Sequence, residues 1–327
     1  MESCENNNET YSYYKELAEQ GDADAQVLLG SMFDRGEGVE QDLAEAAKWY
    51  KKAAEQGHPT AQFNLGEMYY LGEGVVQNFV KAAEWYEKAA KQGDETAQFN
   101  LGHMFDSGEG VPQDSKIAAK WYRKAAEQGN AGAQENLAVL YERGDGVEQN
   151  WIKATELFRK AAEQGLVSAQ FTLGCLYYIG EGVEQDRLKA AAWFEKAAEQ
   201  GHARAQFNVG NMYDNGDGVQ RDLVKAAVWY EKAAEQGIVR AQFYLGHIYH
   251  TGDGIAHDLV KAASWYEKAA EQGHAGAQNN LGVMYYKGEG VVQDFDKAAE
   301  WFRKAAERGN KDARLNLKKI NDNIITR

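Results

Sequence analysis

The stretch AQFNLGEMYYLGEGV, residues 61–75, decides the fold because close copies of it recur along the 327-residue chain. Its opening alanine-glutamine pair returns at intervals of 36 residues, at Ala25-Gln26, Ala61-Gln62, Ala97-Gln98, Ala133-Gln134, Ala169-Gln170, Ala205-Gln206, Ala241-Gln242 and Ala277-Gln278. One unit of this length has an apolar face that it cannot bury alone, so eight units in register must stack on each other. The period therefore predicts an elongated, all-α solenoid rather than a globule.

Each unit is predicted to contain two helices joined by a tight loop. In the first unit, Ala25, Leu29 and Phe33 fall on one side of a helix, and Gly36 follows where a left-handed C-terminal residue favours glycine. The second helix begins at a short acceptor side chain that can cap exposed N–H groups. The acceptors in the eight units are Asp42, Asn78, Asp114, Asn150, Asp186, Asp222, Asp258 and Asp294.

The second helix carries a tryptophan that we expect to fill the gap between neighbouring units. Unit 130–165 departs from this pattern, because Leu157 replaces the tryptophan and a new tryptophan, Trp151, stands six positions earlier. In the same unit Ala138 replaces a glycine and Thr155 replaces an alanine. We interpret these changes as compensated repacking, and the alternative is a local change in curvature that reshapes a binding site.

Eight full units are predicted between residues 22 and 309, with half-units at both ends. Residues 1–10 are expected to be a flexible N-terminus, 11–21 an N-terminal half-repeat cap, and 310–327 a C-terminal half-repeat cap and tail. Solenoids need such caps to cover their last apolar faces. The predicted units are 22–57, 58–93, 94–129, 130–165, 166–201, 202–237, 238–273 and 274–309.

Composition and charge indicate which classes of partner and which cellular compartment to expect. A net charge of −14 opposes binding to nucleic acid and to anionic lipid. No apolar run approaches the ~18 residues that span a bilayer, and the first residues lack the features of a secretory signal. Two cysteines, Cys4 and Cys175, make no disulfide framework. We therefore expect a cytoplasmic monomer, while export by another route stays open.

The repeated motif A-Q-x-x-L-G-x-M-Y-x-x-G-x-G-V, followed by A-x-x-W-Y-x-K-A-A-x-Q-G, resembles the Sel1-like repeats. These are relatives of the tetratricopeptide repeat, and the resemblance covers nearly all of residues 11–320. It implies a right-handed α/α superhelical solenoid that acts as an adaptor for other proteins. Bacterial members include host-interaction proteins, and a cysteine-rich branch is linked to penicillin binding and β-lactamase activity. This chain lacks the paired cysteines of that branch.

No set of residues predicts chemistry. His247 and His250 have the i, i+3 spacing of two metal ligands, but no third ligand accompanies them, so no metal site is expected. No Ser/His/Asp or Cys/His set stands out from the repeated template. We therefore predict a protein that is not an enzyme, with no catalytic residues and no cofactor. The acidic loop residues are expected to form a solvated ridge: Glu37, Glu73, Glu109, Asp145, Glu181, Asp217, Asp253 and Glu289.

A flank of the first helices remains for binding. Positions equivalent to 24, 28, 31 and 35, here called the first-helix flank, lie apart from the core stripe when each residue advances 100°. By analogy with tetratricopeptide arrays, we assign this flank to a concave groove. Its amides could hold the backbone of an extended peptide, and they stand at Asn64, Asn100, Asn136, Asn208 and Asn280. The alternative is that each asparagine is merely tolerated or bonds its own helix.

The first-helix flank carries more positive than negative residues, in contrast to the net charge of −14 of the whole chain. Its positive residues are Arg35, Arg143, Arg204, Arg240 and Lys287, against the negative Asp24 and Glu67. Arg204 and Arg240 occupy the same position in successive units, and Tyr244 and His247 continue the flank. We add Arg143, Arg204, Arg240, Tyr244 and His247 to the five asparagines as predicted partner-binding residues. Paired guanidinium groups bind carboxylates, so the expected partner is a protein or peptide with acidic or C-terminal carboxylate groups.

Two alternatives to the adaptor function stay open. The first is an exported factor that binds a host protein, and the second is a hydrolase of cell-wall or β-lactam substrates. It also stays open whether the groove or the acidic loop edge is the main binding face.

Overall fold

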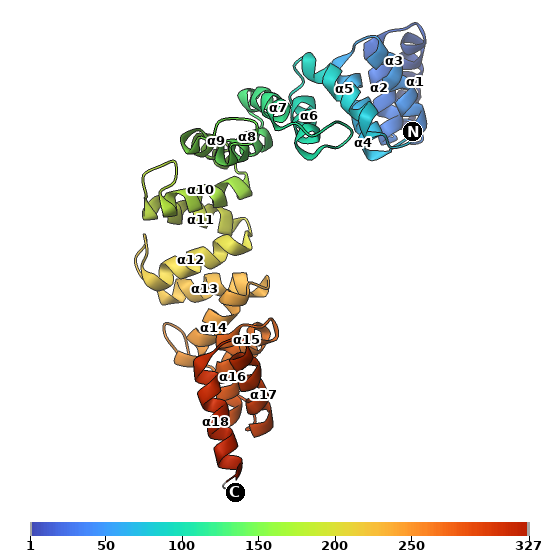
Figure 1. Ribbon diagram of the computed structural model, residues 1–327. Coiled ribbons are helices and arrows are strands. Elements are labelled where there is room, and N and C mark those ends of the chain that lie inside the picture. Colours follow the sequence, from blue (N-terminus) through green and yellow to red (C-terminus); the bar gives the residue numbers. More distant parts are fainter. Residues whose placement is uncertain (1, 326–327) are drawn as a thin grey trace. The chain divides into compact units, whose positions relative to one another are not determined.

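The computed structural model describes residues 2–325, which form 18 helices and no strands (Figure 1). Within these residues, no helix is both long and apolar enough to cross a membrane. The helices are α1 Glu2–Glu19, α2 Ala23–Arg35, α3 Leu43–Glu55, α4 Pro59–Leu71, α5 Phe79–Lys91, α6 Glu95–Ser107, α7 Ser115–Gln128, α8 Ala131–Arg143, α9 Trp151–Glu163, α10 Val167–Ile179, α11 Arg187–Glu199, α12 Ala203–Asn215, α13 Leu223–Glu235, α14 Val239–Thr251, α15 Leu259–Glu271, α16 Ala275–Lys287, α17 Phe295–Glu307 and α18 Lys311–Ile325.

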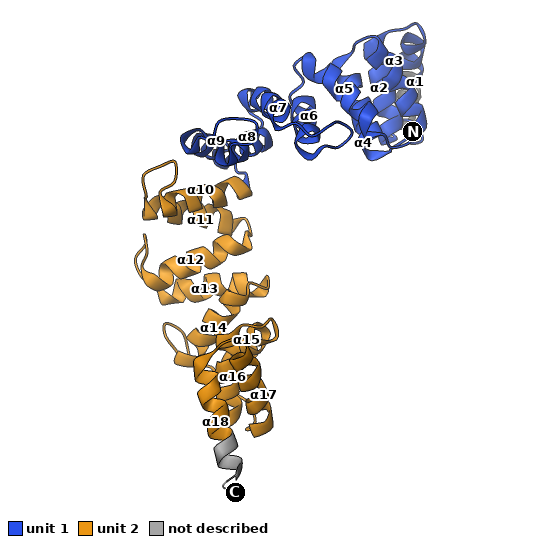
Figure 2. Cartoon of the chain, in the orientation of Figure 1, with its two compact units in different colours: residues 1–166 blue, residues 167–327 orange. Residues whose placement is uncertain are grey.

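The helices group into two compact units, residues 1–166 and residues 167–327 (Figure 2). In the first, α2 to α9 form four pairs that follow α1. In the second, α10 to α17 form four pairs that precede α18. Inside each unit, every helix packs against its neighbours along the chain. The all-α fold of helix-turn-helix repeats is therefore as predicted from the 36-residue period.

The helix ends follow the predicted signals. Gly36 takes the left-handed conformation, with φ of 69°, and its N–H donates to the carbonyl of Met32 at the end of α2. At the start of α3, the Asp42 carboxylate accepts a hydrogen bond of 2.9 Å from the Glu45 N–H. A short acceptor at this position satisfies an N–H group that the helix itself cannot. The glycine loop and the acceptor thus fix where the chain turns.

A buried ring explains the glycine inside most first helices. Tyr86 of α5 is almost fully buried and lies against Gly66 of α4. A Cβ atom at Gly66 would stand only 2.7 Å from the ring. The two helices of a pair therefore approach closely because one of them lacks a side chain at the crossing point.

Inside each compact unit, buried glutamines join a helix pair to the helix before it. The Gln62 amide of α4 donates to the Ala54 carbonyl of α3 at 3.1 Å, and its oxygen accepts from Gln92 at 2.8 Å. The same Gln92 amide also donates to the Gly57 carbonyl at 2.8 Å. Buried polar groups are stable only when they are hydrogen-bonded. The glutamine of the alanine-glutamine pair, which marked the period in the sequence, thus connects successive 36-residue repeats. We call this set of hydrogen bonds the glutamine joint.

The tryptophans pack between successive 36-residue repeats, as predicted. Trp121 of α7 is buried in a cluster with Ala89 and Ala90 of α5 and Met104 of α6. Trp49 is also buried, whereas the others are half-buried. A lysine three residues later lies over each ring, with its Nζ atom 3.6 to 4.5 Å from the ring centroid, at Trp49, Trp85, Trp121, Trp193, Trp229, Trp265 and Trp301.

Candidate partner-binding site

Most of the predicted asparagines face a tyrosine hydroxyl on the preceding second helix. Asn64 interacts with the hydroxyl of Tyr50, and burial, the largest cause, raises the pKa of that tyrosine to about 12 while the amide opposes the rise. At the equivalent positions Tyr86 lies beside Asn100, Tyr122 beside Asn136 and Tyr266 beside Asn280. Tyr86 and Asn100 both donate to the Glu67 carboxylate, whereas the buried Tyr122 and Tyr266 hydroxyls have no hydrogen-bond partner among the described residues. The sequence offered a self-bonded or a merely tolerated asparagine as alternatives. In the structure these four amides lie at a contact between helices, and their part in partner binding stays a prediction.

Asn208 differs because its neighbour is a phenylalanine. Phe194 of α11 occupies the place that Tyr50, Tyr86 and Tyr122 hold in other pairs, so no hydroxyl stands there to face the Asn208 amide. Asn208 instead lines a pocket of about 190 Å³. We name it the Asn208 pocket, and its lining residues are Cys175, Tyr178 and Ile179 of α10, Phe194 of α11, Phe207, Asn208, Asn211 and Met212 of α12, and Arg240 of α14.

This pocket lies on the first-helix flank. Arg240 stands at the position equivalent to 24, Asn208 at 28, Cys175 and Asn211 at 31, and Ile179 at 35. The structure therefore brings two predicted residues, Asn208 and Arg240, to one pocket. Helical periodicity located the flank, and the phenylalanine in place of tyrosine was the signal that could have located the pocket.

A loop carboxylate, that of Asp217, fixes the position of Tyr178 in one wall of the Asn208 pocket. The Tyr178 hydroxyl donates to Asp217 at 3.0 Å, and Arg187 pairs with the same carboxylate at 2.6 Å. The Arg187 guanidinium also lies over the Tyr178 ring, 3.7 Å from its centroid. Another loop acid, Glu109, accepts from the Tyr70 hydroxyl at 2.9 Å. The expectation of a wholly solvated acidic ridge is wrong at these two positions, because tyrosines reach across from the preceding pair.

Arg240 is exposed and oriented by an aromatic ring. Its guanidinium carbon lies 5.1 Å from the centroid of Phe207. No ion pair involves Arg240 or Arg204 among residues 10–320, whose side chains the structure describes. By contrast, Arg35 and Lys287 lie within 4 Å of loop glutamates. The arginines of α12 and α14 are thus available to an external carboxylate.

Burial shifts the pKa values of Cys175 and His250 in opposite directions. Burial raises the pKa of Cys175, which disfavours the thiolate that acts as nucleophile. His250 is half-buried against the Tyr266 ring, and burial lowers its pKa. Within the described part of the chain, no group of three or more His, Cys, Asp or Glu residues could hold a metal ion.

The other predicted residues lie outside the pocket wall. Tyr244 of α14 stacks on Tyr230 with ring centroids 5.4 Å apart, and His247 is exposed one turn later. Arg204 is exposed near the start of α12. Arg143 is exposed at the end of α8, and it lies with Asn64, Asn100 and Asn136 in residues 1–166, the other compact unit.

The family model of the Sel1 repeat matches eight consecutive segments, residues 23–58, 59–94, 96–130, 131–166, 167–202, 203–238, 239–274 and 275–310. The chain belongs to the Sel1 repeat family. This Sel1 repeat protein is 40% identical to a protective antigen present in uropathogenic Escherichia coli strains that displays an SLR fold. The TM-score is 0.89, and the match covers 95% of this chain and 67% of that one.

A second solved structure is that of a Sel1 repeat protein from Oxalobacter formigenes. It is 36% identical, with a TM-score of 0.69, and the match covers 94% of this chain and 89% of that one. A comparison with curated proteins found no match. Sel1 repeat proteins are generally scaffolds for protein interaction and are typically not enzymes.

Proposed function

We propose that this Sel1 repeat protein is an adaptor that binds an extended segment of a partner protein along the first-helix flank. The principal contact is the Asn208 pocket. The observation that carries the proposal is the replacement of tyrosine by Phe194, which leaves the Asn208 amide without its usual hydroxyl, beside an Arg240 guanidinium that has no carboxylate partner among the described side chains.

The lining chemistry indicates which segment fits. A carboxylate, from an acidic side chain or a C-terminus, pairs with Arg240. The Asn208 amide can donate to and accept from a peptide backbone, while an apolar side chain packs against Phe194 and Phe207. An exposed ion pair contributes only up to about 1 kcal/mol and is screened by salt. Tight binding therefore requires further contacts, for which we propose Arg204, Tyr244 and His247.

Charge reversal tests the role of the arginines. The double variant Arg204→Glu, Arg240→Glu is expected to bind the partner at least about tenfold more weakly, since a factor of ten corresponds to ~1.4 kcal/mol. Affinity capture from native lysate identifies the partner, and titration then measures its affinity. The double variant Arg303→Glu, Arg314→Glu, which makes the same two charge reversals at exposed positions of α17 and α18, is the matched control. Retention of the partner by the double variant, with loss on substitution of loop acids, would place binding on the acidic edge.

Restoring the hydroxyl tests the role of Asn208. Phe194→Tyr places a hydroxyl beside the Asn208 amide, as Tyr50 does beside Asn64, and is expected to weaken partner binding severalfold. Thermal stability should change little. Phe302→Tyr makes the same change in α17, outside the pocket, and should leave affinity unaltered. Equal affinities of wild type and Phe194→Tyr for the partner would show that the amide takes no part.

A second candidate function is recognition of a host protein outside the cell. It is favoured by the 40% identity to a relative described as a protective antigen. Fractionation of the native cell, followed by antibody detection in the medium and on intact cells, tests it. Detection confined to the cytoplasmic fraction contradicts it.

A further inference from the structure

The pair formed by α8 and α9 lacks the tryptophan that the second helix of every other pair carries. Leu157 of α9 takes its place. In other pairs inside each compact unit, the indole packs over an alanine of the preceding second helix, as Trp85 does in a cluster with Ala54. Leu157 packs against the buried cluster of α7 and α8, and the partly buried Ala126 packs against the same cluster. The position is thus the same, but the side chain is smaller.

The exposed fraction of the alanine that lies beneath this side chain shows the effect of the smaller leucine. Ala54 and Ala90 are 2% and 1% exposed beneath the tryptophans that follow them, whereas Ala126 is half-buried. Ala306 is also half-buried, in the last pair, which no tryptophan-bearing helix follows. The hydrogen bond to the Ala126 carbonyl from Gln134 is 3.3 Å long and only partly buried. The leucine therefore leaves uncovered a surface that an indole covers elsewhere.

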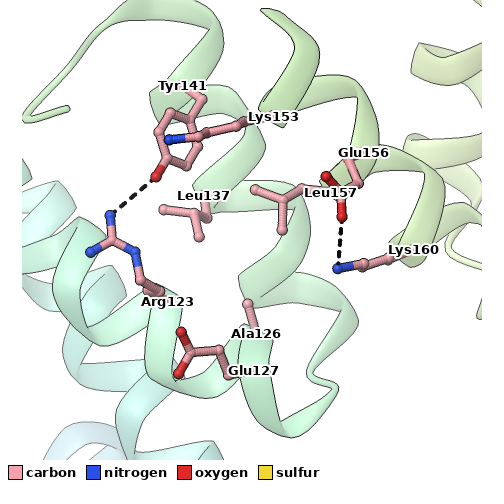
Figure 3. Close-up of a pocket in the computed structure, with 9 residues that line it drawn as sticks. All are labelled: Arg123, Ala126, Glu127, Leu137, Tyr141, Lys153, Glu156, Leu157 and Lys160. Carbon is pink, nitrogen blue, oxygen red and sulfur yellow. Dashed lines mark hydrogen bonds and ion pairs between the residues drawn. The ribbon is translucent and has the colours of Figure 1, made fainter. Parts of the chain in front are cut away.

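A pocket of about 220 Å³ occupies this place (Figure 3). We name it the Leu157 pocket. Apolar atoms of Leu137 and Leu157 stand on two sides of it, with Ala126 beneath. All lining residues belong to α7, α8 and α9: Arg123, Ala126, Glu127, Leu137, Tyr141, Lys153, Glu156, Leu157 and Lys160.

Charged side chains surround this apolar floor. Arg123 donates to the Tyr141 hydroxyl at 3.1 Å, and Lys153 lies over the Tyr141 ring, 5.3 Å from its centroid. Lys160 corresponds to the lysines that cover indoles in other pairs, and here it pairs with Glu156 at 3.2 Å (Figure 3). Cations attract the face of an aromatic ring, and a carboxylate can accept from an indole N–H.

We propose that the Leu157 pocket binds a tryptophan side chain from an exposed segment of a partner protein. The chemistry of the place favours an indole, because other pairs hold one there between an alanine and a lysine, and Leu157 fills only part of that place. The extra tryptophan of the same pair, Trp151, begins α9 and is not among the lining residues. Aromatic anchors in apolar pockets dominate many protein interfaces. This contact lies in residues 1–166 and is independent of the Asn208 pocket.

Binding of an indole ring to the Leu157 pocket is tested first, with the full chain as the protein and 5-fluoroindole as the probe. Fluorine NMR should show line broadening and a Kd on the order of 1 mM, as expected for so small a ligand. Leu157→Trp should abolish binding because the new indole occupies the pocket, and it should raise the denaturation midpoint. Leu188→Trp, the same change at an exposed leucine of α11, should leave binding intact. Ala126→Leu provides a second blocking variant should Leu157→Trp lose helical circular dichroism.

The peptide is tested next, with acetyl-Gly-Gly-Trp-Gly-Gly-amide and its alanine counterpart as probes. Only the tryptophan peptide should compete with 5-fluoroindole, and only in proteins with an open pocket. Absence of fluoroindole binding to the wild type, or equal binding to the two blocked variants, overturns the inference. Binding of fluoroindole without competition by the tryptophan peptide shows a site for free aromatic molecules and overturns the docking of a protein segment.

Discussion

Truncation of Trp121 to alanine is expected to lower the free energy of unfolding by about 3–5 kcal/mol, the usual range for a buried large aromatic side chain. Trp121 is 6% exposed and contacts both α5 and α6. Its loss removes apolar contacts from Ala89, Ala90 and Met104 and leaves Lys124 without the ring beneath it. Chemical denaturation followed by circular dichroism measures the change.

Leu157→Ala is the matched comparison, because it truncates the equivalent side chain one pair later. Leu157 is half-buried beside an existing pocket, so its loss should cost less than about 2 kcal/mol. A neutral Trp121→Ala variant, or equal losses for the two variants, would contradict the role assigned to the tryptophans as packing between units.

Deletion of residues 274–309 should leave a folded but less stable protein. The joint is preserved, because Gly273 then precedes Asn310 as Gly309 does in the intact chain. The Asn310 N–H can donate to the Ala269 carbonyl, as the His274 N–H now does at 3.0 Å. Stability of a repeat protein is approximately a sum over units and their interfaces, so removal of one unit and one interface subtracts one term of each.

A deletion of residues 274–303 provides the comparison. It is six residues shorter and leaves part of α17 joined out of register after α15, so α18 cannot dock through the same bonds. We expect the mean helicity per residue to be retained only by the 36-residue deletion, as measured by far-ultraviolet circular dichroism. If the shorter deletion retains helicity and the longer one loses it, the 36-residue unit is not the element of the fold.

The sequence predicted local features of the fold well because they depend on neighbours in the chain. Gly36 and Asp42 act at the ends of their own helices, and their signals are short in range. The glutamine joint was not predicted, since Gln62 and Gln92 meet only after α4 and α5 have packed, and Gln62 reaches the Ala54 carbonyl only after that pair has packed on α3. The two glutamines lie 30 residues apart along the chain, and no local propensity reports such a contact.

The candidate site was predicted in part for the same reason. Helical periodicity placed Asn208 and Arg240 on one flank, but it treated all five asparagines alike. What separates Asn208 from Asn64 is the residue 14 positions earlier, Phe194 against Tyr50. That difference has meaning only once the packing of each first helix against the preceding second helix is known. The Leu157 pocket likewise depends on a contact across two pairs, although the missing tryptophan was visible in the sequence.

The glutamine joint also bears on how such a chain can change in length during evolution. Gln62 bonds to a main-chain carbonyl and to another copy of its own kind, so the connection does not depend on the variable residues of either unit. A duplicated or lost internal copy therefore brings its buried amide to an equivalent partner, whereas in the last pair, where Arg308 replaces the second glutamine, the Gln278 oxygen has no partner among the described residues. Unequal recombination between repeats can lengthen or shorten the gene product without a second, compensating mutation at the new junction, while residues on the exposed flank diverge freely.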